Sequence, residues 1–305
     1  MPEIVDDKSP HCIPFIVERI KAHQNRFKDQ SDVPPFFLGI NGVQGAGKST
    51  LVSALSQTLE SPPHSLPTAV LSIDDLYLTH ADQRKLASDH PSNPLIQHRG
   101  EPGTHDIRLG AYVLDALAQG RQVKLPRYEK AAFDGEGDRA DPATWAEVNG
   151  PGQPRIQVVV FEGWCVAFRP LTGEALRERW EDSRKRAAEG VESVMARHGL
   201  ENLAWVNEAL KAYDTFTDKL DALIHIDAED TKFVYRWRLE QEAELRRLKG
   251  KGMTNEQVVK FVDGYYPAYE LFTDTLRVGV FGSEHGKQLR LIVGEDRKVK
   301  KVLRI

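Results

Sequence analysis

Residues 42–50 of the chain read Gly-Val-Gln-Gly-Ala-Gly-Lys-Ser-Thr, which satisfies the pattern G-x-x-x-x-G-K-[ST]. The stretch follows an apolar run at residues 36–40 that is typical of a buried strand. The last residues of the stretch begin a segment, residues 48–59, for which we expect a helix. A strand, a glycine-rich turn and a helix in this order are the context that the pattern requires. The stretch therefore predicts a nucleotide-binding α/β fold.

The residue types of this loop match the needs of a bound triphosphate. Glycine at three positions lets the backbone approach without a Cβ, so that successive N–H groups can line a phosphate at the positive end of the helix. Lys48 supplies a charge for the β- and γ-phosphates, the Ser49 hydroxyl can ligate Mg²⁺, and Thr50 can bond the α-phosphate. The predicted ATP-binding residues of the loop are Gly42, Gln44, Gly45, Ala46, Gly47, Lys48, Ser49 and Thr50.

Further apolar runs extend the predicted sheet. Four of them predict buried strands, at residues 69–73, 156–161, 223–226 and 289–293. Segments with helical spacing lie before and between the strands, among them residues 13–27, 109–118 and 203–220. This alternation predicts an α/β fold with a doubly wound parallel sheet, in a single domain that occupies all 305 residues.

Composition narrows the class of protein. Hydrophobic residues make up 40% of the chain and charged residues 28%, which is ordinary for a globular protein. The net charge of −4 gives no support to nucleic-acid binding, and no apolar stretch is long enough to span a membrane. The two cysteines, Cys12 and Cys165, have no metal-ligand spacing, and the acidic first ten residues do not resemble a targeting segment. We expect a cytoplasmic protein, with a nuclear location left open.

Two charged segments stand apart from the predicted core. Residues 172–198 are mostly charged and small, and we interpret them as an exposed helical insertion, with a docking surface as the alternative. Residues 297–304 hold five basic side chains. We expect them to form a solvated terminus, although contact with nucleic acid or a localisation signal is the other interpretation.

Carboxylates follow two of the predicted strands. The Asn/Thr-Lys-x-Asp segment by which GTPases commonly read guanine is not found, and Asp74 and Asp75 come directly after the second strand. Carboxyl ends of parallel strands line the ligand crevice, so one of these carboxylates is expected to accept the proton of an attacking hydroxyl group. Glu162, after the strand at 156–161, is expected to contact magnesium. The alternative for the aspartates is a role in capping a turn.

The loops between these strands carry cations in a chain that is acidic overall. Arginine can hold a carboxylate through two hydrogen bonds, which a small hydroxy acid needs because it offers little apolar area. We therefore predict a small anionic substrate, although exposed loop cations are the ordinary alternative. A nucleoside substrate would instead need an aromatic side chain on which its base stacks, and Tyr77 and Tyr128 are the two candidates. The candidate substrate-binding residues are Tyr77, Arg99, His105, Arg127, Tyr128, Lys130 and Arg139.

The series of motifs resembles the D-glycerate 3-kinase family of plants and its fungal relatives. This family belongs to the P-loop kinases, the group that contains uridine kinase, phosphoribulokinase and pantothenate kinase. The stretches that carry the resemblance are residues 42–50, 74–79, 93–95, 99–100, 103–106, 124–128, 137–142, 161–164, 206–226, 235–239 and 265–269. The insertion at 172–198 is longer and more charged than we expect from the plant enzymes. Leu76 also replaces the phenylalanine expected after the two aspartates.

The resemblance implies phosphoryl transfer from MgATP to D-glycerate. It makes Lys48, Asp74 and Glu162 the candidate catalytic residues, with Asp74 as the base, and Ser49, Asp75 and Glu162 the candidate magnesium ligands. Residues 235–238 fall where related kinases carry a lid, so Arg236 is expected to contact ATP phosphates. Two alternatives stay open: a kinase for a nucleoside or a pantothenate-like acid, and a regulatory protein that binds ATP without transferring phosphate.

Overall fold

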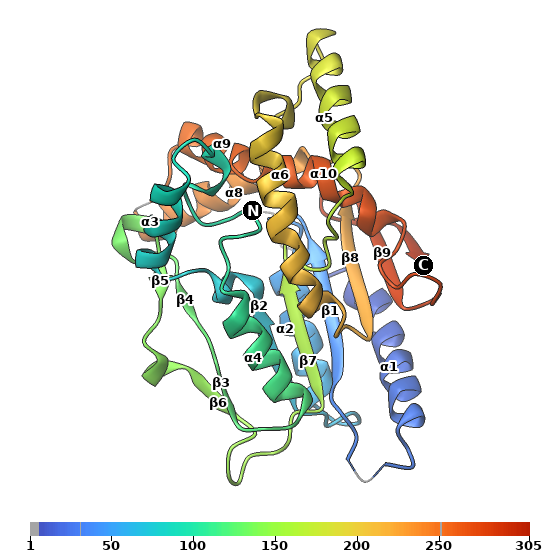
Figure 1. Ribbon diagram of the computed structural model, residues 1–305. Coiled ribbons are helices and arrows are strands. Elements are labelled where there is room, and N and C mark those ends of the chain that lie inside the picture. The colour runs from blue at the N-terminus through green and yellow to red at the C-terminus, as the bar shows by residue number, and fades with distance from the viewer. Residues whose placement is uncertain (1–5, 31, 251) are drawn as a thin grey trace.

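A six-stranded sheet with the order β10-β9-β8-β1-β7-β2 forms the centre of the computed structural model (Figure 1). The structure describes residues 6–30, 32–250 and 252–305. The strands are β1 (Phe36–Gly42), β2 (Thr68–Ser72), β7 (Val158–Gly163), β8 (Ala222–Ala228), β9 (Gln288–Val293) and β10 (Val299–Arg304). The first five of these run parallel and β10 runs antiparallel to β9. The five predicted strands and the parallel sheet are confirmed.

Helices cover both faces of this sheet (Figure 1). One face is packed by α1 (Ser9–Arg26) and α2 (Lys48–Glu60), which also contact each other. The other is packed by α4 (Ile107–Ala118) and α6 (Leu200–Leu210). β1 and β8 are buried along their whole length, as expected for parallel strands between two helical layers. No helix within the described ranges is long and apolar enough to cross a membrane.

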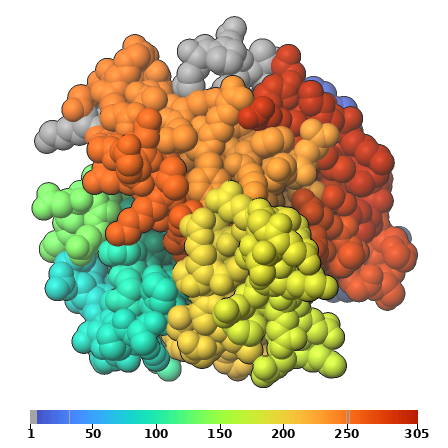
Figure 2. Space-filling view, turned by 90° about the horizontal axis from the view of Figure 1, so that it is seen from above, coloured from blue at the N-terminus to red at the C-terminus, as the bar shows by residue number. Residues whose placement is uncertain are grey.

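The remaining elements are mostly short or lie above the sheet. The helices among them are α3 (His80–Asp89), α5 (Gly173–Ala188), α7 (Asp214–Thr217), α8 (Phe233–Lys249), α9 (Asn255–Asp263) and α10 (Tyr266–Arg277). Two small antiparallel pairs join β3 (Val123–Leu125) to β6 (Ala146–Val148) and β4 (Tyr128–Glu129) to β5 (Asp138–Arg139). Figure 1 shows α8, α9 and α10 across the upper edge of the sheet, and Figure 2 shows this face from above.

Two segments differ from the expectations of the sequence. Residues 203–220 do not form one helix, because a 3-10 turn at Lys211–Tyr213 separates α6 from α7. Residues 297–304 are not a free terminus: most of them form β10, an edge strand that pairs with β9. The basic residues of β10, Lys300, Lys301 and Arg304, remain exposed, and charged side chains on an edge strand oppose pairing with other chains.

The charged segment 172–198 contains α5. This helix begins after Thr172, whose side chain accepts a hydrogen bond from the Ala175 N–H group at 3.2 Å. It buries Leu176 and Ser183 and leaves the rest of its surface wholly or partly exposed. Val194 and Met195, which follow it, are buried again, so the segment is anchored at both ends.

Candidate active site

The phosphate-binding loop joins β1 to α2 at the upper edge of the sheet. Gly42, the last residue of β1, lies beside Ile226 of β8, and a Cβ there would come within 3.0 Å of the Ile226 Cβ. Lys48 opens α2 and its Nζ donates to the Gly42 carbonyl oxygen at 2.7 Å. Burial lowers the pKa of Lys48, and the nearby charges of Glu162 and Asp74 partly offset this effect. The ammonium group therefore lies beside both predicted strand-end carboxylates.

Residues from distant parts of the chain support this loop. The Tyr265 hydroxyl donates to Gln44 Oε1, and the Gln44 N–H donates to the Tyr269 hydroxyl at 3.3 Å. Arg297, between β9 and β10, donates from Nε to the Gly45 carbonyl oxygen at 2.9 Å. Its guanidinium group also lies 5.3 Å from the centroid of the Trp237 ring. The loop is thus held from outside at two of its residues.

Gly45 leaves no room for a side chain. Its φ is +84°, and an added Cβ would lie 2.6 Å from the Trp237 Cβ, closer than two carbon atoms can pack. We expect Gly45→Ala to lower the free energy of unfolding by about 2–4 kcal/mol, from backbone strain and overpacking together. Gly135→Ala is the matched control, because Gly135 has φ +98° with nothing within 4 Å of the added atom. Urea unfolding of both variants measures the difference; equal losses would refute the contact with Trp237.

Asp74 lies on a 3-10 turn, Ile73–Leu76, and not on a strand end as the sequence predicts. Strand β2 stops at Ser72, whose hydroxyl accepts a hydrogen bond from the Asp74 N–H group at 3.3 Å and so caps the turn. The Asp74 carboxylate forms an ion pair with Lys130 through Oδ2. Its Oδ1 is buried and has no hydrogen-bond partner in the described part of the chain. One carboxylate oxygen is therefore available to a ligand.

The charge state of Asp74 follows from its neighbours. Burial by itself would raise the pKa of this carboxyl group, but the charges of Lys130 and Lys48 hold the pKa below its usual value. Asp74 is therefore ionised at neutral pH. An ionised carboxylate with a free oxygen can accept a proton, as a general base must.

Asp75 faces a different partner. Its Oδ1 accepts a hydrogen bond from the Tyr128 backbone N–H at 3.0 Å, which ties the turn to β4. Burial raises the pKa of Asp75, and the charge of Asp74 adds to this effect. The two aspartates thus have different partners, and both lie on the same 3-10 turn. The hydrogen bond from Tyr128 indicates that Asp75 stabilises the position of β4 relative to the 3-10 turn.

Glu162 lies on β7 between its two neighbouring strands. It is in register with Ile40 of β1 and Ser72 of β2, and its side chain is partly exposed. Ser49 is exposed on the first turn of α2. Among the described residues there is no cluster of three or more His, Cys, Asp or Glu side chains that could hold a metal ion. Ser49 and Glu162 offer a hydroxyl and a carboxylate oxygen, and Mg²⁺ commonly takes one or two protein ligands and the oxygens of bound phosphates.

Tyr77 and His105 pack together beside Asp74. Their rings stack with centroids 4.4 Å apart, and the backbone of the two residues forms an isolated antiparallel bridge. His105 Nδ1 and the Tyr213 hydroxyl lie 2.6 Å apart. Burial lowers the pKa of His105 to about 4. The prediction that His105 is one of the cations is therefore wrong, because this imidazole is neutral at physiological pH.

The loop cations take separate positions. Lys130 reaches Asp74, and Arg99 lies 5.6 Å from the Tyr128 ring centroid while donating to the Gly135 carbonyl oxygen at 2.7 Å. Arg139 pairs with Asp106 at 3.0 Å and donates to the Tyr77 carbonyl oxygen at 3.1 Å. Its contacts brace the turn that carries Tyr77.

Arg127 and Arg236 are both paired with acidic side chains. Arg127 is exposed and lies 2.9 Å from Glu129, its neighbour but one. Arg236, on the first turn of α8, pairs with Glu240 at 3.1 Å and with Glu295 at 2.8 Å. The structure brings neither of them to Lys48 or Asp74. Their predicted contacts with the substrate and with ATP would require these ion pairs to open.

Several residues of the site were given no role in the sequence analysis. Tyr265 and Tyr269 contact Gln44 of the loop, and Trp164 packs against both tyrosines with ring centroids 5.5 and 5.3 Å away. Arg297 was assigned to a solvated tail. Glu101 was not noticed, although it follows one of the quoted glycine motifs directly and is only 1% exposed. A buried acid cannot be recognised from a sequence whose loops are rich in exposed charge.

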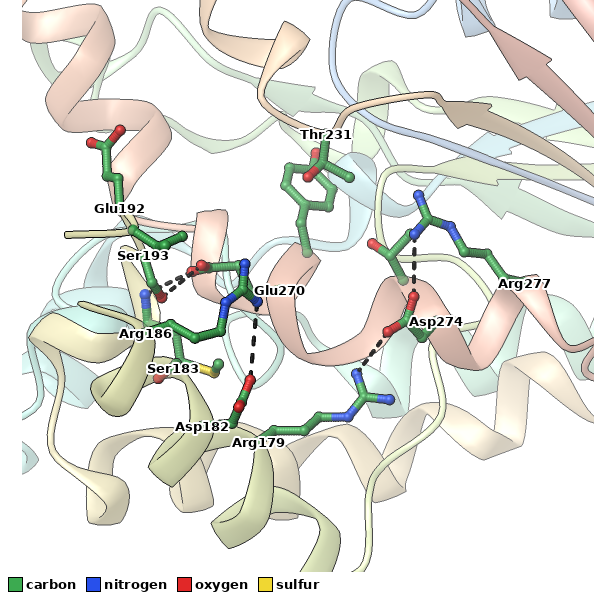
Figure 3. A pocket seen from close by; sticks show the side chains of 14 residues that line it. Arg179, Asp182, Ser183, Arg186, Glu192, Ser193, Thr231, Glu270, Asp274 and Arg277 are labelled. Atoms are coloured by element: carbon green, nitrogen blue, oxygen red, sulfur yellow. Dashed lines mark hydrogen bonds and ion pairs between the residues drawn. The ribbon is translucent and has the colours of Figure 1, made fainter. Parts of the chain in front are cut away.

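A cavity of about 410 Å³ lies between α5 and α10 and shares Tyr269 with the site (Figure 3). None of the predicted site residues lines it. Its arginines are already paired with acids: Arg277 lies 3.0 Å from Asp227, and Arg179 lies 3.5 Å from Asp274. The cavity therefore lacks a free charge of the kind that the loop offers.

Comparisons with known proteins agree with this geometry. An uncharacterised kinase of Schizosaccharomyces pombe is 41% identical over 86% of this chain and 89% of its own. The chloroplastic D-glycerate 3-kinase of Arabidopsis thaliana is 38% identical over 92% of this chain, which spans 57% of the plant protein. The solved structure of a D-glycerate 3-kinase from Cryptococcus neoformans superposes with a TM-score of 0.87, at 33% identity over 99% of this chain and all of the other. No protein-family model matches the chain.

The fold and the site together define a P-loop kinase, an ATP-dependent enzyme that phosphorylates an alcohol group of a small molecule. Its P-loop (residues 42–50) leads from β1 into α2. Since the similarity extends over nearly the whole chain, the chain belongs to the D-glycerate 3-kinase family.

Proposed function

We propose that this kinase transfers the γ-phosphoryl group of MgATP to the 3-hydroxyl group of D-glycerate, which gives 3-phosphoglycerate and ADP. The observation that carries the proposal is the Asp74 carboxylate. It is ionised beside Lys48 and Lys130, and its Oδ1 has no partner among the described residues. The names of the plant and Cryptococcus relatives support D-glycerate as the acceptor.

In the proposed reaction, Asp74 accepts the proton of the acceptor hydroxyl group. The hydroxyl oxygen forms a bond to the γ-phosphorus as the bond from phosphorus to the β,γ-bridging oxygen breaks, and ADP leaves. Lys48 and the N–H groups of the P-loop stabilise the charge that develops on the phosphate oxygens. Lys130 and Arg99, the cations near the Asp74 turn, bind the carboxylate of the acceptor.

Ser49 and Glu162 are the residues that we assign to Mg²⁺. An ion held there would supply positive charge that offsets the negative charge of the bound phosphates. Asp75 is less suited to the metal because its Oδ1 already accepts the Tyr128 N–H. Glu162→Gln, assayed over a range of Mg²⁺ concentrations, tests the assignment: the variant should need more Mg²⁺ for half-maximal rate.

Purified protein with MgATP and D-glycerate is expected to produce 3-phosphoglycerate, with no 2-phosphoglycerate, as mass spectrometry and a phosphoglycerate-mutase-coupled assay would show. A panel of small alcohols, including nucleosides and pantothenate, tests the other acceptors. Faster phosphorylation of another metabolite, with glycerate left untouched, would refute the acceptor and leave the kinase class in place.

The location of the protein is part of the same proposal. We place it in the cytoplasm, where free thiols persist, because Cys12 and Cys165 are both unpaired within the described structure and buried. The net charge of −4 supports a small-molecule substrate over nucleic acid. Fluorescence imaging of the tagged chain would separate cytoplasm from nucleus.

A further inference from the structure

Arg297 has a strained backbone in the turn between β9 and β10. Its φ is +63°, in the left-handed region that residues other than glycine, asparagine and aspartate seldom adopt. Strain of this kind persists only where the surrounding structure holds the residue in place, and it often marks a functional site. Asparagine or glycine would fit this turn at lower cost. An arginine at this position therefore indicates a role for its side chain.

The Arg297 side chain lies against the P-loop and is only 17% exposed. Its Nε donates to the Gly45 carbonyl oxygen at 2.9 Å, and its Nη2 pairs with Glu240 of α8 at 2.7 Å. The guanidinium group also lies 5.3 Å from the centroid of the Trp237 ring, on the same helix. The Trp237 indole N–H in turn donates to the Glu295 carbonyl oxygen at 2.8 Å. One side chain thus joins the P-loop to α8.

The backbone of Arg297 is held by Lys8, which precedes α1. Lys8 is only 4% exposed, and its Nζ donates to the Arg297 carbonyl oxygen at 2.8 Å and to Asp7 at 3.1 Å. The Val299 N–H donates to the same aspartate at 2.7 Å. The Lys8 ammonium group is also close to the P-loop, because a Cβ built on Gly47 would lie 3.8 Å from its Nζ. The turn, Lys8 and the P-loop therefore pack together.

The hydrogen bond from Arg297 acts on the backbone of the P-loop, which is the part of the loop that binds phosphate. The peptide group is planar, so a fixed Gly45 carbonyl group also fixes the plane of the peptide unit that follows. Glycine has no Cβ to limit its rotation, and a hydrogen bond from a charged donor is roughly twice as strong as a neutral one. Arg297 therefore removes freedom that the loop would otherwise lose when a nucleotide binds, which lowers the entropic cost of binding.

We propose that Arg297 is a positioning residue for ATP: it preorganises the P-loop through Gly45, and it sets the affinity for the nucleotide more than the rate of phosphoryl transfer. The inference rests on the proposed function only in that ATP is the donor, and it holds for any acceptor. Lys48 Nζ bonds the carbonyl oxygens of Gly42 and Val43, which precede Gly45. The position of this lysine should therefore not depend on Arg297.

A purely structural role of Arg297 in the hairpin of β9 and β10 is the competing explanation. Arg304 of β10 is the matched control, because it makes the same three kinds of contact elsewhere, although its side chain is 43% exposed. It pairs with Glu18 of α1, donates from Nε to the Gly286 carbonyl oxygen at 3.2 Å, and lies 5.4 Å from the Phe15 ring centroid. A loss of hairpin stability should appear in variants of both arginines, and a loss of nucleotide affinity only in variants of Arg297.

Arg297→Asn is the variant that tests the proposal, because asparagine tolerates a positive φ and keeps the turn while the guanidinium group is lost. Calorimetry with Mg²⁺ and the β,γ-imido analogue of ATP should show binding about 10–100-fold weaker than in the unmodified protein. In steady-state release of ADP, the KM for ATP should rise by a similar factor, while kcat at saturating ATP stays within about threefold. Arg304→Asn should leave the analogue affinity, KM and kcat unchanged.

Two further variants test the same contacts independently. Arg297→Lys keeps a charge and a donor, so it should recover part of the affinity that Arg297→Asn loses. Lys8→Met removes the group that holds the Arg297 carbonyl and keeps an unbranched side chain, so it should weaken analogue binding by about threefold to tenfold. Urea unfolding is measured for every variant.

Equal affinity of Arg297→Asn and Arg304→Asn for the analogue, or a lower kcat with an unchanged KM for ATP, would overturn the inference and leave the kinase activity in place. Should Arg297→Asn not fold, Arg297→Lys and Lys8→Met decide the question, and unchanged affinity in both would overturn it. Failure of the unmodified protein to bind the analogue would refute the proposed function together with this inference.

Discussion

Replacement of Lys48 by alanine is expected to lower kcat by about 10²–10³-fold while the protein remains folded. The Lys48 ammonium is the charge that the structure places at the P-loop, within the fields of Glu162 and Asp74. Without it, the β- and γ-phosphates lose their nearest cation as charge spreads during transfer. The fold should persist, since the Lys48 side chain makes its hydrogen bonds to backbone carbonyl oxygens of the loop alone. Steady-state release of ADP measures kcat, and circular dichroism measures the fold.

Lys85→Ala is the matched control for this variant. Lys85 lies on α3, its side chain is 73% exposed, and it pairs with Asp89 four residues later. Removal of such a surface pair changes stability by less than about 1 kcal/mol and should not affect kcat. If folded Lys48→Ala turned over as fast as Lys85→Ala, the P-loop would not be the catalytic nucleotide site.

Asp74→Asn is expected to lower kcat by about 10²–10⁴-fold, the usual effect of removing a positioned base. Asparagine keeps the size of the side chain and an oxygen for Lys130, but it cannot accept the proton of the hydroxyl group. Binding of ATP should stay near normal, because the hydrogen bonds and ion pair of Asp74 are made to Lys130 and Ser72 and not to the P-loop. Calorimetry with a non-hydrolysable ATP analogue checks this binding.

Asp75→Asn makes the same chemical change one residue further on. An asparagine oxygen can still accept the Tyr128 N–H that Asp75 Oδ1 accepts at 3.0 Å, so the turn should keep its shape. We expect a mild loss of kcat at saturating MgATP and acceptor. A larger loss for Asp75→Asn than for Asp74→Asn would exchange the roles of the two carboxylates.

Much of the fold could be predicted because local patterns and global structure agree. The buried strands are short apolar runs, and the P-loop pattern requires the strand before it and the helix after it. β10 was missed for a physical reason: an edge strand packs little, so a sequence in which three of six residues are basic looks like a solvated tail. The break after Leu210 was missed because apolar spacing continues through it, and tertiary contacts of Tyr213 decide the turn.

For the site, the motif predicted the loop between β1 and α2, and the strand-end argument predicted Asp74 and Glu162, of which Asp74 lies on the 3-10 turn after β2 and Glu162 on β7. The charge of His105 could not be predicted, because it depends on burial that only the folded chain creates. The partners of Arg127 and Arg139 were likewise invisible, since an arginine in a loop sequence does not reveal whether an aspartate or glutamate will meet it. The burial of Glu101, which is 1% exposed, could not be predicted either, because only the folded chain creates it.

The support of the P-loop by Arg297 has a consequence for synthesis of the protein on the ribosome. The two groups of the Arg297–Gly45 hydrogen bond are separated by 252 positions in the chain. Lys8 Nζ in turn donates to the Arg297 carbonyl oxygen at 2.8 Å, and the Val299 N–H donates to Asp7. Residues 7 and 8 therefore make these contacts only after the hairpin of β9 and β10 has formed. A growing chain exposes its P-loop long before Arg297 emerges from the ribosome exit tunnel. We expect chains that end before β9 and β10 to hold the P-loop less firmly and to bind ATP more weakly than the full chain.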